Sequence, residues 1–217
     1  NMEMDGNTKN MALTGMAALC LILGILGALG STWLVPDSDD DMEGMDAGTS
    51  LTASWTEMDL ADLGAESESD CEEFAEMMTE EEGGADTECD GTVMTMTMSF
   101  SDICDDSDDE DACDMATGGM IGTIGMWAGI LCALVLTLSL ALPMAGVDAM
   151  DQLPDVAKKV ATWGAGAAML VGMLGWYIMI PESDSETGLG MSGWMAGAAM
   201  TIGLGAAAMD QFVESTE

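Results

Sequence analysis

Long uncharged runs alternate with strongly acidic stretches along this chain. The uncharged runs cover residues 11–35, 118–142, 160–180 and 188–209. Each is long enough to cross a bilayer core as a helix, which takes roughly 20 consecutive apolar residues. The pattern therefore predicts an all-α membrane four-helix bundle, with a small α+β, disulfide-linked extracellular loop domain between helices 1 and 2.

The ends of the runs agree with this interpretation. The second run stops at Pro143, and the third lies between the pair Lys158 and Lys159 and the residue Pro181, where proline cannot continue a regular helix. The fourth run is rich in Gly and Ala rather than Leu, and counts as a span because no charge interrupts it. The first run also suits a secretory signal peptide, but it is longer than a typical signal core and three more runs follow.

Three lysines are the only basic residues and set the predicted orientation. Lys9 precedes the first run, and Lys158 and Lys159 lie between the second and third. Lysine is retained on the cytoplasmic side, whereas Asp and Glu contribute little to orientation. The resulting plan is a cytoplasmic tail at 1–10, an acidic extracellular domain at 36–117, a cytoplasmic loop at 143–159, a short outer loop at 181–187 and a cytoplasmic tail at 210–217. Aromatic residues expected at the membrane interfaces are Trp33, Trp176 and Tyr177 outside and Trp163 inside.

The acidic domain has its own periodicity. Segment 93–101 alternates Met or Phe with Thr or Ser, which predicts a half-buried strand. Segment 51–56 alternates apolar and hydroxyl residues in the same way and predicts a second strand that pairs with the first. Between them, segment 69–82 carries apolar residues at helical spacing, with Ser69 and Glu72 as a candidate capping box.

Four of the six cysteines fall in the acidic domain: Cys71, Cys89, Cys104 and Cys113. In an oxidising outer compartment they predict two disulfides that staple a module too small for a large core. Three pairings are possible, and loop closure favours Cys71 with Cys89 and Cys104 with Cys113. A zinc site is the alternative, although the chain has no C-x-x-C pair and no His. Cys20 and Cys132 lie inside the apolar runs and suit small packing positions.

Two runs of carboxylates, 37–43 and 105–111, raise the question of calcium binding. Hard cations take such oxygen ligands, but neither run has the Gly and Glu that an EF-hand loop places at its sixth and twelfth positions. We therefore predict a solvated acidic surface that attracts cations weakly, and no metal site.

Composition excludes several functions. The chain has a formal net charge of -37, with three Lys and Arg residues together and no His. Nucleic-acid binding draws its affinity from basic residues on phosphates, so no nucleic-acid partner is expected. No nucleophile motif, phosphate loop or cofactor fingerprint is present, so we expect neither an enzyme nor a cofactor. The acidic excess suits a marine or halophilic microbe, because salt screens carboxylate repulsion.

Small residues recur at helix-packing intervals within the apolar runs. The positions are Gly118, Gly122, Gly125, Gly129, Ala168, Gly172, Gly193 and Gly197. Such spacing lets helix backbones approach closely. It serves either packing inside the bundle or lateral contact with a membrane-protein partner or another copy in a homo-oligomer.

Four spans, a first outer loop with strands and cysteines, and Trp33 in Ser-Thr-Trp-Leu-Val resemble the claudin and peripheral myelin protein group of tetraspan proteins. The group's Trp-Gly-Leu-Trp signature is not present. The resemblance implies a structural or adhesive surface protein of the cell membrane, in contact with the lipid bilayer and with neighbouring proteins. The alternative is an accessory subunit of a larger membrane complex, such as a channel, transporter or respiratory assembly.

Overall fold

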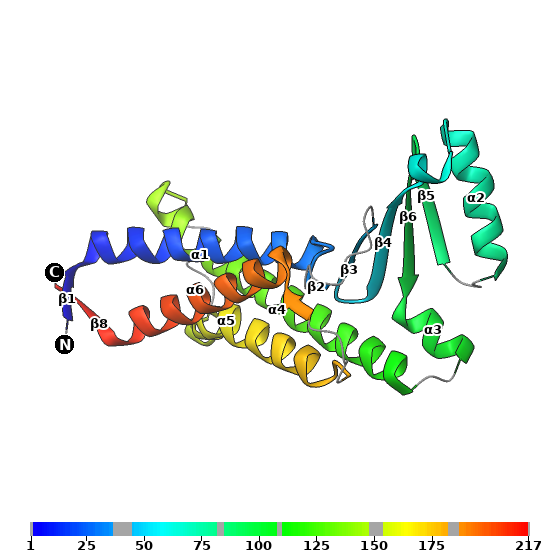
Figure 1. Cartoon of the computed structure of the whole chain (residues 1–217). Coiled ribbons are helices and arrows are strands. Elements are labelled where there is room, and N and C mark those ends of the chain that lie inside the picture. The colour runs from blue at the N-terminus through cyan, green and yellow to red at the C-terminus, as the bar shows by residue number, and fades with distance from the viewer. Residues whose placement is uncertain are drawn as a thin grey trace. The chain divides into compact units, whose positions relative to one another are not determined.

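The computed structural model describes residues 2–36, 45–81, 85–107, 110–147, 154–181 and 187–216. Its α-helices are α1 (Gly6–Leu29), α2 (Glu68–Glu81), α3 (Phe100–Ser107), α4 (Glu110–Met144), α5 (Asp155–Ile178) and α6 (Met191–Phe212), with one 3-10 turn, η1 (Leu60–Leu63). Its strands are β1 (Met2–Asp5), β2 (Leu34–Pro36), β3 (Met45–Thr49), β4 (Ala53–Asp59), β5 (Ala85–Asp90), β6 (Val93–Ser99), β7 (Thr187–Leu189) and β8 (Val213–Thr216). Figure 1 shows these elements along the chain.

The chain divides into two compact units. Unit 1 comprises residues 1–29, 121–175 and 194–217, and unit 2 comprises 30–120 and 176–193. Helices α4, α5 and α6 each contribute residues to both units.

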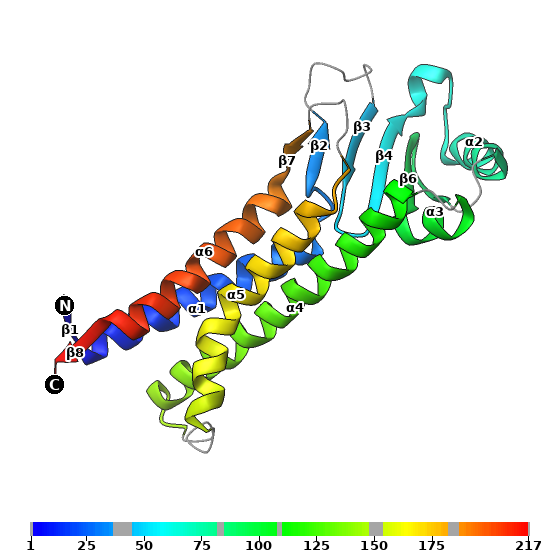
Figure 2. The same cartoon turned by 90° about the horizontal axis from the view of Figure 1, so that it is seen from below.

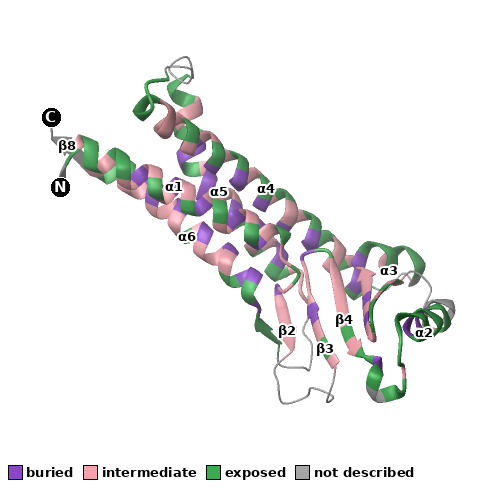
Figure 3. Ribbon diagram, turned by 90° about the horizontal axis from the view of Figure 1, so that it is seen from above, coloured by how far each residue is buried: buried purple, intermediate pink, exposed green. Residues whose placement is uncertain are grey.

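Unit 1 consists mainly of helices, which lie side by side in both ribbon views (Figures 1 and 2). Ala17 of α1 packs with Leu136 of α4 and Ala161 of α5 in a buried cluster. Many apolar residues of these helices are nevertheless exposed, and Figure 3 shows exposed stretches along the helices. They include Leu19, Ile22, Leu26, Ile124, Leu131, Val171 and Leu174. Apolar side chains on the outer faces of long helices suit a lipid environment.

Within the described residues, three helices are long and apolar enough to cross a membrane: α1, α4 and α5. These helices mark the chain as a membrane protein by their length and composition. The run 188–209 also forms a helix, α6, but its Gly-rich and Ala-rich composition leaves it outside this group.

The two ends of the described chain lie together in unit 1. Strand β1 pairs in parallel with β8. The Nζ atom of Lys9 donates hydrogen bonds to the carbonyl of Val213 at 2.7 Å and to that of Asp210 at 3.1 Å. The carboxylate of Asp210 lies 3.8 Å from the same nitrogen. The start of α1 is therefore tied to the end of α6.

Unit 2 is built on a sheet with the strand order β5-β6-β4-β3-β2-β7, and each neighbouring pair is antiparallel. Figure 2 shows most of this order. Strand β4 pairs with β6 from Ala53 opposite Ser99 to Asp59 opposite Val93. The predicted pairing of the two alternating segments is thus confirmed.

One face of the sheet carries the core of unit 2. Met94 and Met96 of β6 are buried there against Cys71 and Ala75 of α2 and against Leu60 of η1. The alternation of Met with Thr along β6 produces this arrangement, because successive strand residues point to opposite faces. Helix α2 begins at Glu68, and Asp70 rather than Glu72 is the acidic side chain that bonds back to the entering chain.

The predicted all-α membrane four-helix bundle is wrong. The described chain is mixed α+β, with a six-stranded antiparallel sheet, six helices and three apolar helices that qualify as spans. Two short strands of this sheet lie outside the predicted strand segments. Strand β2 directly follows α1, and β7 lies between α5 and α6. Three-residue strands carry no period-two signal, so the sequence pattern could not reveal them.

Candidate functional site

Both predicted disulfides are present in unit 2. Cys71 of α2 is bonded to Cys89 of β5, with Cα atoms 6.1 Å apart, and Cys104 of α3 is bonded to Cys113 of α4, with Cα atoms 4.8 Å apart. The first bridge links α2 to the sheet, and the second links α3 to α4. Cys20 and Cys132 are free cysteines in the helices of unit 1, and Cys20 is fully buried.

Five of the eight small residues singled out in the sequence meet between α4 and α5 in unit 1: Gly122, Gly125, Gly129, Ala168 and Gly172. A Cβ atom on Gly125 would lie 2.8 Å from the Ala168 carbonyl oxygen, and one on Gly172 would lie 3.1 Å from the Gly122 carbonyl oxygen. The absence of side chains thus permits close backbone approach.

The other three small residues have separate neighbours. Gly118 lies against Met179 and Gly193 against Leu189, both within unit 2. A Cβ atom on Gly197 would have only an ordinary contact with a methionine side chain.

The aromatic residues assigned to the outer interface divide into two groups. Trp33 and Trp176 are buried in unit 2, whereas Tyr177 is exposed. Trp163, assigned to the inner interface, is also exposed. Burial of two indoles against each other gives them a packing role within unit 2.

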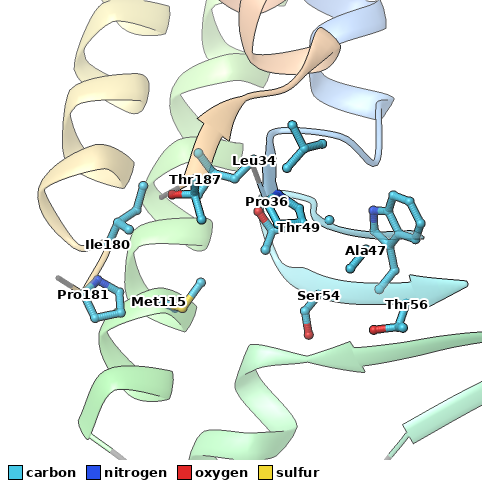
Figure 4. A pocket seen from close by; sticks show the side chains of 13 residues that line it. Leu34, Pro36, Ala47, Thr49, Ser54, Thr56, Met115, Ile180, Pro181 and Thr187 are labelled. Carbon is cyan, nitrogen blue, oxygen red and sulfur yellow. The ribbon is translucent and has the colours of Figure 1, made fainter. Parts of the chain in front are cut away.

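An apolar cleft of about 330 Å³ lies in unit 2 (Figure 4). Its walls include Leu34 and Pro36 of β2, Met115 of α4, and Ile180 and Pro181 beyond the end of α5. Hydroxyl groups in the lining come from Thr49, Ser54, Thr56 and Thr187, and Gly48 and Trp55 also contribute to it. The described lining contains no titratable side chain, so the cleft offers volume for an apolar group but no acid, base or metal ligand.

Thr49 is unusual among these hydroxyls. Its Oγ1 atom is buried and has no hydrogen-bond partner within the described residues. A buried hydroxyl without a hydrogen-bond partner lowers stability. Thr49 therefore contributes an unsatisfied polar group to the wall of the cleft.

The opposite face of the sheet has a different chemistry. Side chains directly across neighbouring strands share a face, and the register puts Trp55 between Gly48 and Thr97, and Glu57 beside Thr95. A hollow of about 280 Å³ on this face is lined by Trp55, Glu57, Thr95 and Thr97. Its lining also includes Ser31, Ser50 and Ala53. This face combines an aromatic ring, hydroxyls and a carboxylate.

The indole of Trp55 has a fixed position on this face. Its Nε1–H donates to the carbonyl of Ser31 at 2.9 Å. A Cβ atom on Gly48 would lie 2.9 Å from the ring, so the indole rests on the bare backbone of β3. Glycine at position 48 is therefore a condition for this placement of the ring.

Two carboxylates at the ends of elements in unit 2 are held by hydrogen bonds. The backbone N–H of Ala61 and the hydroxyl of Thr92 bond to Asp59 and lower the pKa of its carboxyl. The backbone N–H of Glu66 and the hydroxyl of Ser67 do the same for the pKa of Asp70. Hydrogen bonds to the ionised form favour that form, so both groups act as structural caps.

Of the two acidic runs that suggested calcium binding, the described residues include 105–107 and 110–111 of the second. Residues 37–43 lie outside the described residues, as do 108 and 109 within the second run. Among the residues that are described, no group of three or more Cys, Asp or Glu side chains is placed to hold a metal ion.

The contact between Trp55 and Gly48 could not be predicted from the sequence. The two residues lie on different strands, and no local sequence pattern determines how those strands align. The acidic alternation of β5, with Asp86, Glu88 and Asp90 at every second position, was available as a signal. It predicts a strand with one charged face.

No protein-family model matches this chain, and no curated protein matches it. The resemblance to the claudin group therefore gains no support from either comparison.

Proposed function

We propose that this chain is a non-enzymatic integral membrane protein with a structural or adhesive role, and that it presents unit 2 outside the cell. The observation that carries the proposal is the acidic face around Trp55 and Glu57. This face offers an aromatic ring, hydroxyls and the Glu57 carboxylate on one surface of the sheet, and such groups form contacts with other proteins.

The orientation follows from the three lysines and from the ends of the chain. Lys158 and Lys159 lie near the start of α5, and Lys9 lies in the first turn of α1. The pairing of β1 with β8 holds the start of α1 beside the end of α6. Lysine is enriched on the cytoplasmic side of membranes, and this supports our proposal that both chain ends lie in the cytoplasm and unit 2 lies outside.

Helix α6 crosses with α1 in this proposal, despite its weaker hydropathy. Lys9 bonds to Asp210 at one end of the helix pair. Gly27 of α1 lies against Ala196 of α6 at the other end, where a Cβ atom on Gly27 would be 2.9 Å from the Ala196 nitrogen. A helix that accompanies α1 over its length shares the environment of α1, and small residues suit such close packing.

A second candidate function, an accessory subunit of a larger membrane complex, is favoured by a groove in unit 1. The groove has a volume of about 450 Å³ and runs between α4 and α5, with Ile124 and Val171 exposed at its walls and Gly125 and Gly172 among its lining residues. An apolar groove over small residues is the type of surface on which another transmembrane helix packs.

Two experiments test these candidates. Reconstitution in liposomes tests for a transport function, and identification of bound proteins distinguishes the two candidates from each other. The purified protein in liposomes should conduct no ions alone, since translocation sites normally carry charged or ion-coordinating side chains within the spans. Mass spectrometry after mild-detergent purification identifies bound proteins. A stoichiometric catalytic or conducting subunit would favour the accessory role, and selective flux from the protein alone would refute both candidates.

A further inference from the structure

We propose that the acidic face of the sheet in unit 2 binds the guanidinium or ammonium groups of a positively charged protein segment, with Glu57 and Trp55 as the central contacts. The inference deepens the proposed structural or adhesive role and depends on it, because it specifies the chemistry of the partner.

The register of the strands places carboxylates in a row across this face. Asp46 of β3 stands opposite Glu57 of β4, Glu57 stands opposite Thr95 of β6, and Glu88 of β5 stands opposite Thr95 on its other side. Asp46, Glu57 and Glu88 are exposed. Like charges directly opposite each other on neighbouring strands are destabilising, so a cation placed over Asp46 and Glu57 relieves an unfavourable pairing.

A second row lies beside the first. It contains Gly48, Trp55, Thr97 and Asp86, which the register places opposite one another across β3, β4, β6 and β5. Trp55 and Glu57 are two residues apart on one strand and therefore project from the same face. A cation bound by Glu57 thus lies next to an aromatic ring, where cation–π attraction adds to the ion pair.

Unit 2 itself contains no basic residue that could neutralise this face. Unit 2 comprises residues 30–120 and 176–193, and the three basic residues of the chain, Lys9, Lys158 and Lys159, all fall in unit 1. Helix α2 lies against the other face of the sheet, as its packing on Met94 and Met96 requires. The acidic face is thus complementary to a basic segment, and the hollow of about 280 Å³ beside Trp55 accommodates one side-chain head group.

The test uses the full-length protein in nanodiscs of neutral phosphatidylcholine. A fluorescent peptide of eight arginines is the probe, with peptides of eight glutamates and of Gly-Ser repeats as controls, and anisotropy gives the dissociation constant at roughly physiological salt. Glu57→Gln should weaken binding about tenfold, because a charge-assisted hydrogen bond is lost. Trp55→Leu should weaken it about fivefold through loss of the cation–π contact. The matched control Glu73→Gln removes one carboxylate from the exposed side of α2 and should change binding less than about twofold.

Equal losses in the Glu57→Gln and Glu73→Gln variants would show that only the diffuse negative field attracts the peptide, and would overturn the site. Absence of binding to the arginine peptide would overturn it as well. If Trp55→Leu prevents formation of the disulfides, Glu57→Gln decides the matter, since the Glu57 side chain is exposed and its replacement leaves the core intact. Each of these failures leaves the liposome result on ion flux untouched, so the proposed function is tested separately.

Discussion

The rings of Trp33 and Trp176 meet edge to face, with centroids 5.0 Å apart and an interplanar angle of 68°. The N–H of Trp33 donates to the carbonyl of Thr49 at 2.6 Å, and its carbonyl accepts from the N–H of Gly190 at 2.8 Å. The chain after α1, the end of α5, strand β3 and the start of α6 are thus joined at one residue within unit 2. Loss of the Trp33 side chain should loosen all of them together.

Replacement of Trp33 by Ala should lower the free energy of unfolding by about 3–5 kcal/mol, because a fully buried indole leaves a large cavity. Trp33→Phe keeps an aromatic partner for Trp176 and should cost less. Trp194→Ala is the matched control, since Trp194 is 69% exposed, and should change stability by less than about 1 kcal/mol. Unfolding in detergent, followed by near-ultraviolet circular dichroism, gives the three values. Equal effects at positions 33 and 194 would contradict the packing role.

The bridge between Cys71 and Cys89 should be a main source of stability for the sheet and α2. The bonded cysteines are 18 residues apart, and closing a loop of this length contributes about 3 kcal/mol. The double variant Cys71→Ala with Cys89→Ala should therefore unfold at lower denaturant concentration and should respond less to added reductant than the natural chain. Alkylation of both thiols in protein prepared without reductant would refute the bridge.

Two glycine substitutions should have opposite effects in unit 1. Gly125→Ala places a methyl group against the backbone of α5 and should destabilise by about 1–3 kcal/mol through overpacking. Gly15→Ala meets nothing within 4 Å and should stabilise by up to about 1 kcal/mol through higher helix propensity. Thermal unfolding in the same detergent compares them directly. A stabilising Gly125→Ala would show that α4 and α5 do not pack closely at this point.

Acid should weaken unit 2 through Asp59. Its hydrogen bonds lower the pKa of the folded carboxyl below the ordinary value of 3.8, so the unfolded chain takes up this proton first as the pH falls. The stabilisation is fully present above 3.8 and is lost as the pH falls through the folded pKa. Asp59→Asn keeps a hydrogen-bond acceptor without a titrating group, so the dependence of unfolding on pH below 3.8 should become shallower in this variant. An unchanged dependence would exclude Asp59 as a contributor.

Periodicity predicted the parts of the fold that are long or regular. The apolar runs became helices, segment 93–101 became β6 as far as Ser99, and its partner segment became part of β4. Cysteine positions and loop closure gave both disulfides. The helices and strands depend on residues that are close together in the sequence, and each disulfide closes a short loop. A single sequence is therefore enough to predict them.

The fold class was missed because it depends on long-range pairing. Strand β2 pairs with β7 over three residues, and the partners stand more than 150 positions apart by their residue numbers. No local pattern encodes such a pairing. The acidic face was missed for the same reason, since Glu57 meets Asp46 and Thr95 only through the register of three strands. The negative charge was evident, but its arrangement around Trp55 was not.

The central claim, that unit 2 lies outside the cell and the chain ends lie inside, is tested most directly by protease shaving of intact cells. Trypsin is unsuitable because no basic residue falls between Lys9 and Lys158, so a protease that cleaves after glutamate is used, with an epitope tag placed after Glu217. We expect the tag to survive on a membrane-bound fragment that has lost α1 and the sheet, and to be removed only after permeabilisation. Loss of the tag from intact cells, with unit 2 protected, would contradict the orientation and the proposed function with it.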